Sequence, residues 1–462
     1  MLLTSILVYL ILTIFVGFWA SRKVRNSNDF ILAGRSLPLL LGSTALFATW
    51  FGSETVFGAS SEFLQGGLYR TIEDPFGAAL CLLLFGMFFA RKLYRMRLLT
   101  LGDFFKVKYG KSTELVATIF LAPPYVGYIA AQMVAMGLIL NAVAGLELWH
   151  GIVVSALVVT VYTYIGGMWA ITITDFIQTI IIIGGLLTLS VSLGIKAGGV
   201  STILSSVPSE DLRFLPSPDF REVVTYLAAW AVLGLGSIPS QDVFQRAMSS
   251  RSAGVAVWSC YIAAGLYITI AMLPLFISLC IKQLYPEQIA GDTQLALPNM
   301  VLLHMSMPVQ ILFFGSLLSA IMSTTSSAIL APASILSENF VKPLTRHRVS
   351  DRQLLFITRV GVLIFSALAT VMATLRTNIY ELVGESSILS LVSLFAPLVF
   401  GLYWKRSSSG GALLSMVLGM LTWIIFEFSE TKWPALVPAT LVSIAAMIAG
   451  SLVWPGKSKT KK

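Results

Sequence analysis

A run of five hydroxyl side chains, residues 323–327, lies inside one of the apolar stretches of this sequence. Two carboxylates, Glu54 and Asp175, lie inside other apolar stretches. Ionisable side chains are costly inside a membrane and usually serve a function there. Hydroxyl, carbonyl and carboxylate oxygens are the ligands of hard cations, and Na⁺ has only one charge to balance. These oxygens therefore indicate a Na⁺ site, although helical Ser and Thr also bond to carbonyls of their own preceding turn.

Two further segments, 47–54 and 233–242, place glycine, proline or polar residues in the middle of apolar runs. Irregular backbone at membrane depth is tolerated only where it lines a cavity. Helices that are interrupted at corresponding places in two halves of a chain are typical of transporter binding sites, and unwound carbonyls there can coordinate Na⁺. Two kinked structural helices are the alternative interpretation.

The composition excludes an ordinary water-soluble domain. Hydrophobic residues make up 56% of the chain and charged residues only 11%, whereas soluble proteins carry roughly 25% charged residues. The net charge of +9 is spread over short stretches between apolar runs, so we expect a lipid bilayer and no nucleic acid as partner. The cysteines and histidines lack metal-ligand spacing, so we expect no enzyme active site. No obligatory protein partner is evident from the sequence.

Apolar runs long enough to cross a bilayer recur about thirteen times. The first run, Leu2–Ala20, is too long for a signal peptide and lacks a cleavage site, so it predicts a retained membrane helix. The sequence thus predicts an all-α polytopic membrane protein with a single domain over residues 1–462 and a long external loop near residues 197–222. The expected helix centres are Tyr9, Phe51, Leu83, Ala130, Leu157, Ile182, Val232, Leu266, Ala320, Phe365, Leu391, Leu418 and Ala445.

The loops between these runs differ in their content of Lys and Arg. If the N-terminus lies outside and the chain alternates, 23 of the 31 Lys and Arg residues fall on the inner side, Arg246 among them. Seven fall on the outer side and Arg359 within a helix. Inner loops of membrane proteins are rich in Lys and Arg. We therefore expect a plasma membrane location, as in a bacterial inner membrane, with the N-terminus outside and the C-terminus in the cytoplasm.

Four motifs in chain order resemble the sodium:solute symporter family. They are Asp29-Phe30-Ile31-Leu32-Ala33-Gly34-Arg35, the segment 99–110 (LTLGDFFKVKYG), the segment 162–170 (YTYIGGMWA) and the segment 174–178 (TDFIQ). The resemblance implies a leucine-transporter-like inverted repeat of five plus five helices, with one extra helix before it and two after it. Its expected parts are an extra helix and loop at 1–37, repeats at 38–195 and 222–403, and terminal helices with a basic tail at 404–462.

The resemblance also implies two groups of Na⁺ ligands. The first site is expected from the carbonyls of Ala48, Phe51 and Ala320 and the hydroxyls of Ser323 and Thr324. Some members of the family have a second Na⁺ site, whose residues match Asp175, Ser326 and Ser327 here. Na⁺ is accordingly the expected coupling ion.

Within the family, segment 236–246 and the pair Thr49-Trp50 are most similar to choline-type and proline-type members. Ser240 stands where choline-type members carry a tryptophan, which weakens the case for a cation–π cage.

Glu54 matches a glutamate that faces sugar in sugar-type members, and Asp74 is either a second binding group or part of an external acidic vestibule. We expect no arginine near the breaks. The residues expected to bind the solute are Trp50, Ser53, Glu54, Asp74, Tyr128, Gln132, Ser240 and Gln241.

The expected function is Na⁺-coupled symport of a small organic solute by alternating access, the solute being an amino acid such as proline or an amine such as choline. A proton-coupled or a sugar-type symporter of the same fold is the alternative, because Glu54 or Asp175 could titrate. Asp242 lies four residues before Arg246, so a structural ion pair on one helix face is an alternative to a role for Asp242 in binding.

Overall fold

The computed structural model describes residues 2–22, 27–345, 349–429 and 431–455. Over these residues the chain is helical without strands, and a single isolated bridge joins Leu37 to Ser250. The expected all-helical class is confirmed for this part of the chain. The first-half helices are α1 (Leu2–Ser21), α2 (Ser27–Leu32), α3 (Leu39–Phe47), α4 (Ser60–Gly66), α5 (Ala78–Leu84), α6 (Arg91–Arg95), α7 (Leu101–Tyr109), α8 (Lys111–Leu121), α9 (Pro124–Ala144), α10 (Leu148–Lys196) and α11 (Val200–Ser206).

Later helices are α12 (Phe220–Gly236), α13 (Gln241–Met248), α14 (Ala253–Ile270), α15 (Met272–Leu284), α16 (Ala296–His304), α17 (Met307–Ile335), α18 (Lys342–Leu344), α19 (Asp351–Leu375), α20 (Ile379–Ser390), α21 (Ala396–Tyr403), α22 (Ser409–Glu427) and α23 (Leu436–Val453). Several of these helices are continued by π-helical turns: η2 (Glu54–Ala59), η4 (Ile72–Gly77), η5 (Phe85–Ala90), η8 (Leu336–Val341) and η9 (Leu391–Phe395).

Nine helical segments of the described chain are long and apolar enough to cross a membrane, and α12 with α13 makes a tenth if this bent pair is one span. The thirteen expected centres lie in helices or, for Phe51, in a helix break. Two of them, Leu157 and Ile182, fall in the 49-residue α10. The side chains of Tyr162 and residues 165–167, which belong to one family motif, lie outside the described part, as does the tail from residue 456.

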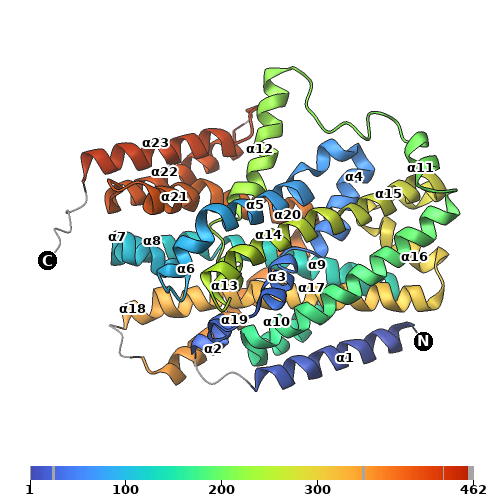
Figure 1. The fold of residues 1–462 in the computed structure, drawn as a ribbon, viewed down its shortest axis with the longest axis horizontal. Coiled ribbons are helices and arrows are strands. Elements are labelled where there is room, and N and C mark those ends of the chain that lie inside the picture. Colours follow the sequence, from blue (N-terminus) through green and yellow to red (C-terminus); the bar gives the residue numbers. More distant parts are fainter. Residues whose placement is uncertain (1, 23–26, 346–348, 430, 456–462) are drawn as a thin grey trace.

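Helix α17 is the central element of the bundle. It packs against α1, α9, α10 and α19, and every residue from Phe313 to Ile335 is buried. A helix that is buried all round is apolar on every face in most proteins, so the hydroxyl run within α17 is exceptional. In Figure 1, α1 lies along one edge of the bundle, and α22 with α23 lies at the opposite edge.

Both expected interruptions occur where the sequence places glycine or proline. Helix α3 ends at Phe47, and helical geometry resumes only at Ser53, before η2. Helix α12 ends at Gly236, and α13 begins at Gln241 after a bend of 48°. Gly236 has no room for a side chain, because a Cβ there would lie 2.4 Å from the Ser387 carbonyl oxygen. The close approach of two backbones thus holds α12 against α20 at the second break.

Helices α22 and α23 approach each other through small residues, a common way for membrane helices to pack. A Cβ on Gly411 would lie 2.6 Å from the Met447 carbonyl oxygen, so Gly411→Ala is expected to lower the free energy of unfolding by about 1–3 kcal/mol. Thermal unfolding of the purified protein measures this loss. Gly265→Ala is the control, since no atom outside its helix lies within 4 Å. Equal melting temperatures for the two variants would contradict the close packing.

Candidate functional site

The first break contacts the hydroxyl run of α17 directly. Thr324 Oγ1 donates a hydrogen bond to the Ala48 carbonyl oxygen over 2.9 Å. That carbonyl belongs to the residue after α3, where the helix no longer uses all its backbone acceptors. Ser323 lies beside Thr324 and donates to Asp175 Oδ1 over 2.6 Å. The structure therefore brings together Ala48, Ser323 and Thr324 from the first expected Na⁺ site.

The other two members of this group lie close to these residues along the chain. Phe51 is buried in the same break, and Ala320 is buried one turn before Thr324 on α17. A Cβ on Gly52 would lie 3.4 Å from Ile321, so the backbone of the break lies directly on α17. The oxygens of this region are hydroxyls, a carbonyl and one nearby carboxylate, a donor set that suits Na⁺.

Two residues of the second expected Na⁺ site contact an arginine. Arg246 Nη2 lies 3.3 Å from Asp175 Oδ2 and donates to Ser327 Oγ over 2.9 Å. Ser326 faces α10, where Thr163 Oγ1 donates to its hydroxyl over 2.9 Å. Asp175 and Ser327 are therefore joined through a guanidinium group, while Ser326 has a different neighbour.

The expectation that no arginine lies near the breaks is wrong. Arg246 lies beside the breaks, is only 1% exposed and pairs with Asp175. It does not pair with Asp242. Tyr125 donates to Asp242 Oδ1 over 2.9 Å, which turns that carboxylate toward α9 and leaves Arg246 to Asp175. Buried charges are stable only when they are paired, and the Arg246–Asp175 pair meets that need.

A small cavity lies where the two breaks meet α9 and α20. Of the residues expected to bind the solute, Trp50, Tyr128 and Ser240 line it. Tyr128 donates to the Thr49 carbonyl oxygen over 2.6 Å, so its ring is held at the first break. The complete lining is Trp50, Pro124, Tyr125, Tyr128, Gly236, Ser237, Ser240, Asp242, Val383, Ser386, Ser387 and Ser390.

The remaining expected solute residues are buried outside this lining. Ser53 is fully buried, and Gln132 Nε2 lies 3.4 Å from Glu54 Oε1. Asp74 accepts from Tyr267 over 2.8 Å. Gln241 Oε1 accepts from a backbone N–H of α7. These five residues therefore do not line the cavity with Trp50, Tyr128 and Ser240.

A separate open hollow has acidic side chains in its lining. Glu62, Glu73 and Glu381 line this hollow together with Arg70, whereas Asp74 is 1% exposed and does not line it. The neighbour of Asp74, Glu73, therefore lines this hollow, and Asp74 does not.

Sequence reasoning did not single out most polar groups of the cavity. The sequence left Asp242 open between an ion pair with Arg246 and a role in binding, and it did not predict the three serines of α20 as cavity residues. Ser386, Ser387 and Ser390 occur at positions that share one helical face, in a helix that is otherwise largely apolar. That spacing is the signal that would have found them.

A helical bundle with two broken membrane helices around a buried, oxygen-lined centre defines a multi-pass membrane transporter. The chain belongs to the sodium:solute symporter family, whose family model matches residues 30–419. The resemblance inferred from the motifs is therefore confirmed.

Relatives of known function include choline and proline transporters. The chain is 30% identical to the high affinity choline transporter 1 of Mus musculus over 90% of this chain and 75% of that protein. It is 26% identical to the osmoregulated proline transporter OpuE of Bacillus subtilis over 99% and 96%. A solved Na⁺-coupled sialic acid symporter has the same fold, with a TM-score of 0.88, 17% identity and coverage of 100% and 99%.

Proposed function

We propose that this protein carries a small organic solute across a plasma membrane together with Na⁺, by alternating access. The observation that carries this proposal is the hydrogen bond from Thr324 to the Ala48 carbonyl, which joins the first broken helix to the hydroxyl-rich α17. Membership of a family of Na⁺-coupled symporters supports it. The solute is an amino acid such as proline or an amine such as choline.

Na⁺ binds, in this proposal, to the carbonyls of Ala48, Phe51 and Ala320 and the hydroxyls of Ser323 and Thr324. One ion there replaces the direct Thr324–Ala48 bond and still ties the first break to α17. An inward-moving Na⁺ contributes about 2.3 kcal/mol per 100 mV, which supports roughly 50-fold accumulation of solute before the Na⁺ gradient is counted.

A second Na⁺ at Asp175, Ser326 and Ser327 requires the Arg246 guanidinium to withdraw from Asp175, because both are cations that compete for one carboxylate. We therefore propose that this site is available only in conformations in which the Arg246–Asp175 pair is open. Such a site makes the number of coupled ions depend on an internal salt bridge.

The solute binds in the cavity between the two breaks, α9 and α20. The rings of Trp50, Tyr125 and Tyr128 supply apolar and cation–π contacts, and Asp242 supplies a negative charge. This combination favours a solute with a positively charged nitrogen. Ser53, Glu54, Asp74, Gln132 and Gln241 complete the binding path in other conformations of the cycle.

For the membrane arrangement we propose thirteen crossings, with the N-terminus outside and the C-terminus in the cytoplasm. The repeats comprise residues 38–195 and 222–403, and each has its helix break near its start, at 48–52 and 237–240. This correspondence supports an inverted repeat.

Uptake into proteoliposomes tests the function. Radiolabelled proline, choline, other amino acids and amines, and sugars are offered with an inward Na⁺ gradient, an inward proton gradient or neither. We expect one solute class to accumulate only with the Na⁺ gradient. Accumulation driven by the proton gradient alone would support the proton-coupled alternative and contradict Na⁺ coupling.

Asp242→Asn is expected to weaken binding of a cationic solute about ten-fold or more, because a hydrogen bond or ion pair to a charged group is worth roughly 1.5–3 kcal/mol. The apparent affinity for uptake measures this effect. Ser386→Ala is the matched control, since Ser386 lines the same cavity but its hydroxyl bonds to its own helix at the Leu382 carbonyl. If the two variants change the apparent affinity for uptake equally, Asp242 does not contribute to solute recognition.

A further inference from the structure

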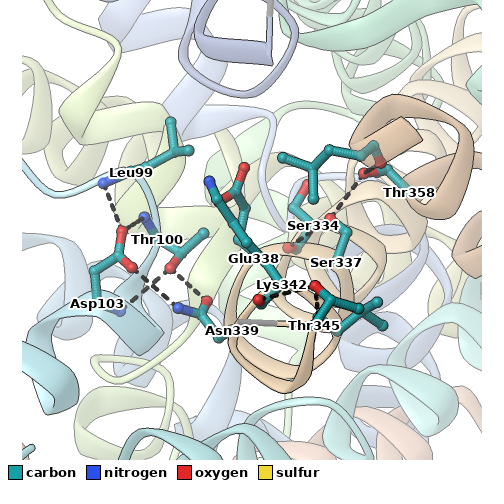
Figure 2. A network of polar contacts seen from close by, with 12 residues as sticks. Leu99, Thr100, Asp103, Ser334, Ser337, Glu338, Asn339, Lys342, Thr345 and Thr358 are labelled. Carbon is teal, nitrogen blue, oxygen red and sulfur yellow. Dashed lines mark hydrogen bonds and ion pairs between the residues drawn. The ribbon is translucent and has the colours of Figure 1, made fainter. Parts of the chain in front are cut away.

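The hydroxyl-rich helix α17 continues into the π-helical turn η8, and the buried Asn339 lies in that turn. Its side-chain amide is bonded through both polar atoms. Nδ2 donates to Asp103 Oδ1 over 3.0 Å and to Glu114 Oε1 over 2.9 Å. Oδ1 accepts from Thr100 Oγ1 over 2.6 Å. Figure 2 shows Asn339 facing Thr100 and Asp103 across the gap between the two elements.

The partners of Asn339 are held in place by the start of α7. Thr100 and Asp103 form a capping box, in which the Thr100 side chain accepts from the Asp103 backbone. Asp103 Oδ2 accepts from the backbone N–H groups of Leu99 and Thr100 over 3.0 and 3.1 Å. One carboxylate oxygen of Asp103 therefore fixes the helix start, and the other is presented to Asn339.

The same end of α7 is bonded to the second broken helix. The backbone N–H of Leu101 donates to Gln241 Oε1 over 2.7 Å, and Gln241 is the first residue of α13 after the break. Helix α7 thus contacts both the continuation of α17 and the start of α13, two elements that meet the candidate ion and solute sites.

The fit between α7 and Asn339 leaves no space. A Cβ on Gly102 would lie 2.5 Å from Asn339 Cγ and Oδ1. The amide also keeps two acidic side chains together, since it gives one N–H to Asp103 and one to the fully buried Glu114. Lys106 Nζ lies 3.3 Å from Glu114 Oε1 and balances part of this charge. If Asn339 moves away, several bonds are lost together, so the contact is either closed or open.

We propose that Asn339 is the hub of a latch, formed with Thr100, Gly102, Asp103, Glu114 and Gln241, that holds α13 and α17 against α7 and must open before the cavity reaches the cytoplasm. Asn339 is a positioning residue in this role. The inference rests on the proposed symporter function and orientation.

A reporter cysteine in the cavity tests the latch. Ser390→Cys lines the cavity, and the native Cys81, Cys260 and Cys280 are buried. In inside-out vesicles with Na⁺, a membrane-impermeant thiol reagent is expected to label this cysteine about ten-fold faster in Asn339→Ala. The loss of a hydrogen bond to a charged group has at least that effect on an equilibrium. Gly102→Ala should act similarly by forcing α7 and Asn339 apart.

Ser334→Ala is the matched control, because Ser334 lies on α17 just before η8 and its hydroxyl donates to the Leu330 carbonyl of its own helix. Its labelling rate should equal that of the parent. If all three variants label at the parent rate, the latch is wrong. A rise in right-side-out vesicles instead would keep the latch and reverse the proposed orientation.

A reversible cross-link guards against misfolding of the single variants. When Thr100→Cys/Asn339→Cys is oxidised, the disulfide holds the latch closed, and the reporter cysteine in the cavity should be labelled more slowly than in the parent. After reduction and removal of the reductant, the latch bonds are missing, and the reporter should be labelled faster than in the parent. Equal rates before and after reduction would overturn the latch. If labelling responds to the latch variants but never to Na⁺, the latch stands and the proposed Na⁺ coupling fails.

Discussion

Thr324→Ala is expected to weaken Na⁺ binding by about 10–100-fold, the range found when a group that orients a metal site is removed. Thr324 Oγ1 is the atom that contacts the Ala48 carbonyl oxygen at the first break. Its removal deletes one proposed ligand and the link between the break and α17. Binding of ²²Na⁺ to the purified protein measures this loss without knowledge of the solute.

Thr325→Ala is the control for this experiment. Thr325 is the next residue on α17, is equally buried, and bonds to the Ile321 carbonyl of its own helix over 2.6 Å. Its removal should change Na⁺ affinity less than about two-fold, since it deletes only a bond within the helix. If Thr324→Ala and Thr325→Ala bind Na⁺ equally well, Thr324 is not part of the site.

Arg246→Met is expected to lower the free energy of unfolding by about 3–5 kcal/mol, because it leaves the Asp175 carboxylate buried without its cation. Both side chains are at most 1% exposed. Arg376→Met is the control, since Arg376 pairs with Glu385 where both side chains are more than a third exposed, and such pairs contribute about 0–1 kcal/mol. Thermal unfolding of the purified variants compares the two, and equal losses would contradict a structural role of the buried pair.

The same variant tests the second proposed Na⁺ site. Without the guanidinium, Asp175 is free to bind Na⁺ with Ser326 and Ser327, so added Na⁺ should raise the melting temperature of Arg246→Met more than that of the parent. The double variant Asp175→Asn/Arg246→Met should lose this additional response. If Na⁺ stabilises Arg246→Met no more than the parent, no second Na⁺ site exists at these residues.

The helices and their interruptions followed from local properties of the chain. Apolar runs bounded by charge predicted membrane helices, and the segments 47–54 and 233–242 are interrupted because glycine, proline and polar residues there do not favour continuous helix. The hydroxyl run on α17 pointed to the region that contacts the first break, and the motifs identified the family. Each of these signals depends on neighbours within about ten residues, so sequence alone was sufficient.

The partners of the buried charges were decided by tertiary packing. Asp242 and Arg246 are four residues apart and could have paired on α13, but Tyr125 from α9 takes Asp242, and Asp175 from α10 takes Arg246. These partners are distant in sequence, because a buried charge pairs with a group that the packing of the helices places next to it. The sequence determined that this is a sodium:solute symporter with two broken helices. Only the tertiary structure decided which oxygens, aromatic rings and charges surround the cavity, since those contacts join helices that are far apart in the chain.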